Sequence, residues 1–293
     1  MLSQELDSNL MDLAWSFWSE LGVAGTYNKI QNILILPEEL IFLTSVLADK
    51  DPRLLDEALD WCSKYHRFIS VRRLQTLGKV FDDQTQGAFS IFSTTLNTHA
   101  STKWPIFKKV SGRKVGLSGK SKLSNFESPS MLYLRLRALF GVGARADLLT
   151  YCLMNEQKEY LISDLTEIGY SKRNLAEVMD DFVNAGIFSE IPVRNQKRYA
   201  FIKRVFFKEL MCPLPLRYVS WQLFLEVFLA LRYSILRIEN KSDSVKAIEI
   251  RNLLIKLEDK LQRLNLTPPP MQSDLSAYWR SFADWILKIT KGS

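Results

Sequence analysis

The sequence predicts a mainly α-helical protein with one β-hairpin. Apolar residues recur at helical spacing over most of the chain, and several helices begin with recognisable cap residues. One segment, 187–203, instead shows the alternation and polar turn that are typical of a two-stranded hairpin. The 293 residues are enough for two or three compact domains, and the hydrophobic fraction of 47% is ordinary for a folded protein.

Residues 1–97 are expected to form an N-terminal helical domain. A helix is expected over 37–47, opened by its proline. Asp51 followed by Pro52 is a good cap for a second helix, and Ser70 is a candidate cap for a third. Short helices joined by tight turns predict a small bundle or a pair of helix hairpins.

Residues 98–128 break the helical pattern and are predicted to be a basic linker or long loop rich in Gly and Ser. Seven basic residues and no acidic residue lie within 103–122. Such a run is either a solvated loop or a clamp on a nucleic-acid backbone. As a clamp, it would supply auxiliary backbone contacts from Lys108, Lys109, Arg113 and Lys114.

The order of elements within 129–208 is the most informative feature of the chain. An apolar helix begins at 144, a short helix follows at 162–169, and a tight turn at Gly169-Tyr170 leads to a longer helix over 171–186. The hairpin comes next. Three helices followed by a hairpin predict a winged helix-turn-helix domain, which places one helix in the major groove of DNA.

The helix over 171–186 has polar residues in its first turn and apolar residues behind them. Arginine can contact guanine and asparagine can contact adenine, whereas Ser171 and Lys172 are better placed for phosphate oxygens. The wing tip, 194–198, suits the DNA backbone or the minor groove. The candidate DNA-binding residues are therefore Ser171, Lys172, Arg173, Asn174, Arg194, Asn195, Lys197 and Arg198.

Protein docking and a plain scaffold role are the alternatives for this domain. Glu177, Asp180 and Asp181 lie on the same helix and would repel phosphate if they faced DNA. DNA binding requires Lys172, Arg173 and the wing tip to share one positive face without carboxylates among them. An apolar patch there would favour docking.

Residues 209–293 are expected to form a C-terminal helical domain, with an apolar helix over 221–237 and a long amphipathic helix over 242–266. Within the second helix, apolar residues are spaced four, three, four and three apart: Ile250, Leu254, Leu257, Leu261 and Leu264. This heptad seam has two interpretations, packing within its own domain or a homodimer through the 245–264 helix.

Composition and missing motifs restrict the function further. The net charge of +7 favours an anionic partner, of which nucleic acid is the commonest. Three dispersed cysteines, no signal peptide and an apolar segment interrupted by Glu226 and Arg232 predict a cytoplasmic protein with no membrane contact. His66 and His99 have no partner at metal-ligand spacing, and no phosphate loop is present, so we expect no metal, no cofactor and no catalysis.

The segment 141–203 resembles the winged-helix transcriptional regulators of the MarR and ArsR type. The resemblance rests on GVGARADLLTYCLMN, ISDLTEIGYSKRNLAEVMDDFVNAGIF and NQKRY. The pieces WSFWSELGV, LADKDPRLLDEALDWC and FSTTLNTHASTKWP resemble a group of poorly characterised bacterial regulators, often encoded beside nucleotidyltransferase-type toxins. This resemblance implies a repressor or antitoxin-like autoregulator that binds double-stranded DNA through residues 171–174 and the wing tip, with a toxin as a further partner.

Overall fold

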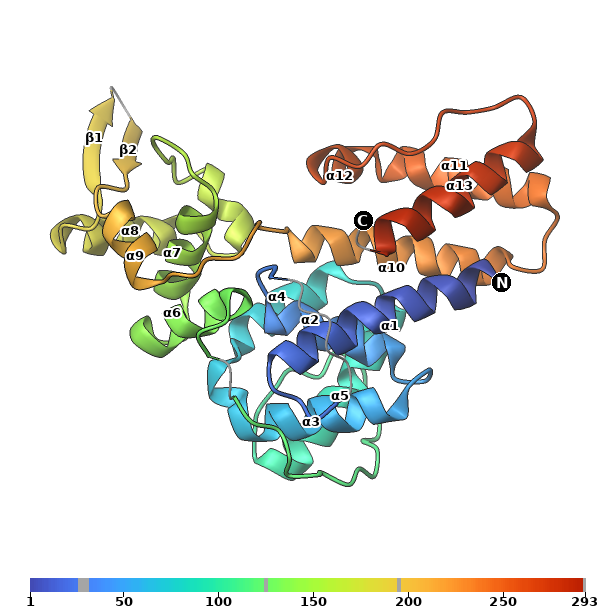
Figure 1. Cartoon of the computed structure of the whole chain (residues 1–293), viewed down its shortest axis with the longest axis horizontal. Helices are drawn as coiled ribbons and strands as arrows, with labels where there is room; N and C mark the ends of the chain where they lie inside the picture. Colours follow the sequence, from blue (N-terminus) through green and yellow to red (C-terminus); the bar gives the residue numbers. More distant parts are fainter. Residues whose placement is uncertain (26–31, 124–125, 194–195, 292–293) are drawn as a thin grey trace.

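The computed structural model describes residues 1–25, 32–123, 126–193 and 196–291. Over these residues the chain is mainly helical and has one two-stranded antiparallel sheet, which confirms the predicted class (Figure 1). The helices are α1 (Leu2–Glu20), α2 (Pro37–Leu47), α3 (Pro52–Tyr65), α4 (Val71–Val80), α5 (Asp83–Ala100), α6 (Leu132–Phe140), α7 (Ala144–Met154), α8 (Lys172–Asn184), α9 (Arg204–Leu210), α10 (Trp221–Ile238), α11 (Asp243–Lys256), α12 (Glu258–Arg263) and α13 (Leu275–Thr290). The strands are β1 (Ser189–Val193) and β2 (Gln196–Ala200), and the short 3-10 helices are η1 (His66–Phe68), η2 (Pro129–Met131) and η3 (Asp164–Ile168).

Helices α1 to α5 form an N-terminal body around α2. Every residue of α2 is buried, because α1, α3 and α5 all pack against it. The expected caps are confirmed: Asp51 accepts hydrogen bonds from two amides of α3, and Ser70 accepts one from an amide of α4. Each cap satisfies a backbone donor that the helix leaves free and contributes about 1 kcal/mol.

The segment 101–123 lies along the N-terminal body. Trp104 is buried, and the ring of Phe107 packs 5.8 Å from that of Phe89. The carboxylate of Asp60 accepts hydrogen bonds from the amides of Gly119 and Ser121, at 2.7 and 3.0 Å. The segment is a loop, and side chains of the N-terminal body satisfy backbone groups along it.

The C-terminal helices pack on the N-terminal body instead of standing apart from it. Helices α10 and α13 both contact α1. Arg232 of α10 forms a buried ion pair with Asp7 of α1, with Nε 2.5 Å from Oδ1. The N-terminal and C-terminal helical regions therefore share one packing surface.

The single helix expected over 242–266 is broken at Leu257 into α11 and α12. Its apolar seam is buried inside the chain, since α11 packs against α10 and α13, and Ile250 and Leu261 are 0% and 2% exposed. The seam therefore packs within its own chain, which is the first of its two interpretations, and a homodimer through the 245–264 helix stays a prediction.

The candidate DNA-binding unit, residues 144–203, has its elements in the expected order. The second helix is a 3-10 turn, η3, because Gly169 ends it after five residues with φ of +91°, too early for a stable α-helix. The hairpin runs from the Ser189–Ala200 pair to the Val193–Gln196 pair, and Tyr160 adds a bridge to Tyr199. This unit lies at the opposite end of the molecule from α11 and α13 (Figure 1).

No helix in the described ranges is long and apolar enough to cross a membrane.

Candidate nucleic-acid interface

Helix α8 positions the first group of candidate residues. Ser171 caps the helix by accepting a hydrogen bond from the amide of Asn174 at 3.3 Å. Its inner face is held in the core by Leu175, Val178, Met179 and Phe182. This face fixes the helix, while Lys172 and Arg173 extend into solvent, with the Arg173 side chain 90% exposed.

Asn174 points differently from its neighbours in the first turn. It is half-buried and its Oδ1 atom is enclosed without a hydrogen-bond partner. Its amide lines a cavity beside the start of α7 together with Tyr170. Asn174 is thus less exposed than Lys172 and Arg173 and forms part of the wall of this cavity.

The hairpin is anchored by aromatic packing. Phe188 stacks on Phe182 of α8 and on Phe201, with ring centroids 5.7 and 4.4 Å apart. The side chain of Tyr199 is buried. The backbone amide of Tyr199 donates a hydrogen bond to the Tyr160 carbonyl, and the Tyr199 carbonyl accepts one from the Tyr160 amide. The strands are therefore fixed to α8, and Lys197 and Arg198 lie on them. Arg194 and Asn195 lie outside the described residues.

Three of the candidate cations are paired with carboxylates on the same surface. Arg173 contacts Glu177 at 3.0 Å, one turn further along α8. Lys197 contacts Glu190 at 2.9 Å and Asp180 at 3.5 Å. The hydrogen bond to Glu190, together with the charge of Asp180, raises the pKa of Lys197, so this amine stays charged.

Arg198 is paired as well, with Glu159 at 3.0 Å. The unit 144–203 contains eight basic and nine acidic residues, so the excess positive charge of the chain lies elsewhere. Among the described residues of α8 and the hairpin, the carboxylate-free positive face that DNA binding was expected to require is therefore not present. Lys172 is exposed and has no ion pair within the described residues.

The auxiliary basic residues are not near this interface. Lys108 pairs with Asp83 at 2.7 Å, and the Arg113 amide donates to Thr95 of α5. The loop that carries Lys108, Lys109, Arg113 and Lys114 runs along the N-terminal body, far from the hairpin (Figure 1).

Sequence reasoning missed a buried charge cluster that holds α8 in place: Glu38, Glu39, Arg73, Arg137 and Asp147. Arg137 is fully buried and contacts Glu38 at 2.6 Å and Asp147 at 3.2 Å. Its remaining donors reach the Phe68 carbonyl and the Tyr133 hydroxyl. No donor of this guanidinium is left unpaired, which is what a buried charge requires.

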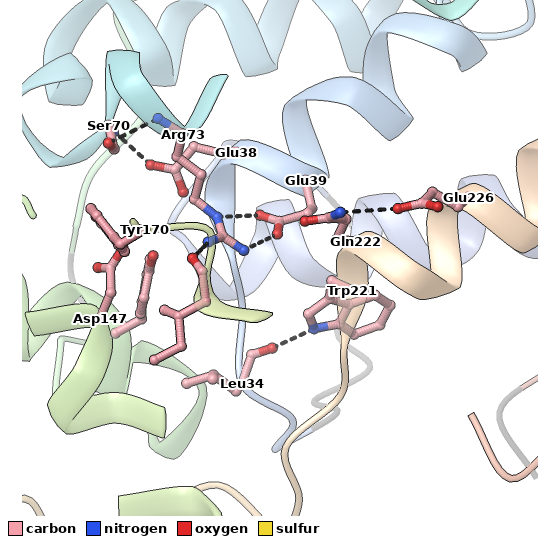
Figure 2. Close-up of polar contacts among 12 residues, drawn as sticks. Leu34, Glu38, Glu39, Ser70, Arg73, Asp147, Tyr170, Trp221, Gln222 and Glu226 are labelled. Atoms are coloured by element: carbon pink, nitrogen blue, oxygen red, sulfur yellow. Dashed lines mark hydrogen bonds and ion pairs between the residues drawn. The ribbon is translucent and has the colours of Figure 1, made fainter. Parts of the chain in front are cut away.

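The cluster reaches α8 through two contacts. Arg73 is bound to Glu39 and donates at 2.9 Å to the carbonyl of Ile168, at the end of η3 (Figure 2). The Tyr170 hydroxyl donates to Asp147 at 2.9 Å. Burial, and then the charge of Asp147, raises the pKa of Tyr170, so the hydroxyl remains a donor. Because Tyr170 directly precedes the Ser171 cap, the cluster anchors the chain just before α8 begins.

Within the described residues, no group of three or more His, Cys, Asp or Glu side chains could hold a metal ion. Comparison with protein-family models, with curated proteins and with solved structures found no match. The resemblance to winged-helix regulators therefore stays a prediction.

Proposed function

We propose that this protein binds double-stranded DNA, with the first turn of α8 in the major groove and the β1–β2 hairpin on the adjacent backbone. The observation that carries the proposal is the exposed first turn of a helix whose opposite face is fixed in the core. The order of helix, turn, helix and hairpin around it supports the same function, as does the net charge of +7.

The carboxylates beside the candidate cations oppose binding but do not prevent it. An exposed ion pair at i,i+4, such as Arg173–Glu177, contributes only about 0.3–0.5 kcal/mol. A bidentate contact from arginine to guanine contributes about 1–3 kcal/mol of base discrimination. Arg173 can therefore exchange Glu177 for a base edge with a net gain.

A regulatory role, as a repressor or antitoxin-like autoregulator, rests on the resemblance alone.

The experiment that tests DNA binding is fluorescence anisotropy with duplex from upstream of the protein's own coding sequence and with scrambled duplex, over a salt series. Tighter binding to the upstream duplex near physiological salt supports the proposal. Equal, salt-sensitive binding to both would reduce it to non-specific attraction, and absence of binding would overturn it.

A second candidate function, protein docking, is favoured by the surface of α9. Val205, Phe206 and Leu210 of α9, and Ile202 just before it, are each more than half exposed, and Phe206 and Leu210 lie one turn apart on the same helical face. The partner that the resemblance suggests is a nucleotidyltransferase-type toxin. Co-purification with the product of the neighbouring gene, lost in Phe206→Glu and kept in Arg173→Ala, would favour docking over DNA binding.

A further inference from the structure

A cavity of about 290 Å³ lies where the N-terminal body meets the candidate DNA-binding unit. Its wall combines Arg72 of α4, Gly143 and Arg145 at the start of α7, and Tyr170 and Asn174 at the start of α8. The volume is at the lower edge of the roughly 300–1,000 Å³ of ligand pockets, which suits a small polar group.

Arg72 provides a positioned cation on this wall. It is exposed, and within the described residues it has no carboxylate partner. Its guanidinium lies 5.5 Å from the centre of the Tyr170 ring, and Asp147 holds that tyrosine through its hydroxyl. The stacking leaves the donors of Arg72 free, whereas Arg173, Lys197 and Arg198 are all paired.

Further donors line the same cavity. Arg145 is half exposed and has Asp181 as its ion-pair partner. The first amides of α7 have no side-chain cap, because the cap position is Gly143. Asn174 lines the same cavity, and its enclosed Oδ1 has no hydrogen-bond donor within the described residues.

We propose that this cavity binds a phosphate group, and that in the DNA complex it holds a backbone phosphodiester next to the bases that α8 contacts. Arginine recognises phosphate oxygens with two parallel hydrogen bonds, and helix amides add to the attraction. Phosphate contacts fix the register of a reading helix without themselves reading sequence.

The proposal rests on the proposed function and removes its main difficulty. The unit 144–203 has more acidic than basic residues, and three of its candidate cations are paired, so a cation from outside the unit adds to its attraction for DNA. Arg72 belongs to the N-terminal body and stacks on the ring of Tyr170, which directly precedes α8. The buried charge cluster holds Tyr170 through Asp147, so it also holds Arg72 close to the start of α8. DNA binding then becomes a property of the two regions together.

The first test measures duplex binding by anisotropy for wild type, Arg72→Ala, Arg72→Lys and Lys79→Ala. Lys79 is the matched control, an exposed cation on the same helix. We expect Arg72→Ala to lose about tenfold in affinity on every sequence and to flatten the salt slope by about 0.9. The duplex affinity of Arg72→Lys should lie between those of wild type and Arg72→Ala, because lysine keeps the positive charge but cannot form two parallel hydrogen bonds to a phosphate. The affinity of Lys79→Ala should equal that of wild type.

The second test uses inorganic phosphate without DNA. Phosphate, compared with chloride at equal ionic strength, should raise the melting temperature of wild type and Lys79→Ala by about 2–4 °C more than that of Arg72→Ala. Equal stabilisation of all three proteins, with equal duplex affinity of Arg72→Ala and Lys79→Ala, would overturn the site. If phosphate raises the melting temperature only when Arg72 is present, and the protein binds no duplex, the cavity is a site for free phosphate. That outcome would overturn the proposed function and leave the phosphate site intact.

Discussion

Two charged regions of this protein use the same residue types in opposite ways. In the buried charge cluster, the side chains of Arg137, Glu38 and Asp147 are 0% exposed. On the candidate interface, the side chains of Arg173 and Glu177 are 90% and 60% exposed. The cluster lies directly behind the interface, because Tyr170 contacts Asp147 and precedes the cap of α8.

The difference separates positioning from binding. A buried ion pair is strongly destabilising to break, because removal of one partner leaves an uncompensated charge in the interior. An exposed pair is screened by water and contributes little, so either partner can be released to a ligand. The cluster can therefore hold α8 rigidly while the cations in front of it change partners.

The largest effect is expected when the cluster is broken. Arg137→Ala should lower the free energy of unfolding by about 3–5 kcal/mol, because Glu38 and Asp147 lose their buried counter-charge. Urea denaturation measures the change. Lys172→Ala, which removes a cation from the exposed turn, serves as the control and should change stability by less than about 0.5 kcal/mol. Similar values for the two variants would mean that burial does not distinguish the regions.

A smaller effect is expected at the interface itself. Arg173→Ala should lower the affinity for a specific duplex by about 1–3 kcal/mol and relax base preference, with little change in the free energy of unfolding. Anisotropy with specific and scrambled duplexes measures both quantities. A loss of equal size on both duplexes would show that Arg173 contacts phosphate and does not read a base.

The sequence was sufficient for features that depend on neighbours in the chain. The caps at Asp51 and Ser70 are confirmed, and so is the hairpin, because each depends on residues a few positions apart. The break at Leu257 was missed, since the apolar spacing continues through it. The local sequence pattern therefore predicts that a segment is helical but not where the helix is interrupted.

Features that join distant residues could not be predicted in this way. Glu38 and Arg137 are 99 positions apart, and Arg73 and the Ile168 carbonyl are 95 apart. The loop over 101–123 has a linker's composition, yet Asp60, Ser90 and Thr95 bind its backbone. Nothing in a charge count showed that Lys197 would face Glu190 and Asp180, because the folded hairpin brings them together.

Lys197 gives the next prediction. Lys197→Ala should weaken binding to all duplexes alike and lower the salt slope by at most about 0.9, since one phosphate contact is removed. The loss should be smaller than for Arg72→Ala, because Lys197 must first leave Glu190. Anisotropy titrations over a salt series show which of the two variants loses more duplex affinity. A larger loss for Lys197→Ala would place the main phosphate contact on the hairpin and not in the cavity.

The smallest effect has the opposite sign, which makes it the sharpest test of the exchange between partners. Glu177→Gln removes the carboxylate that Arg173 must release, so duplex affinity should rise about twofold, consistent with an exposed pair of about 0.3–0.5 kcal/mol. The double variant Arg173→Ala/Glu177→Gln should show no such gain from the glutamine, since the competing pair is already absent. A gain that persists in the double variant would mean that Glu177 acts on DNA by direct repulsion. A loss of affinity in the single variant would mean that the ion pair orients Arg173 for binding instead of competing with it.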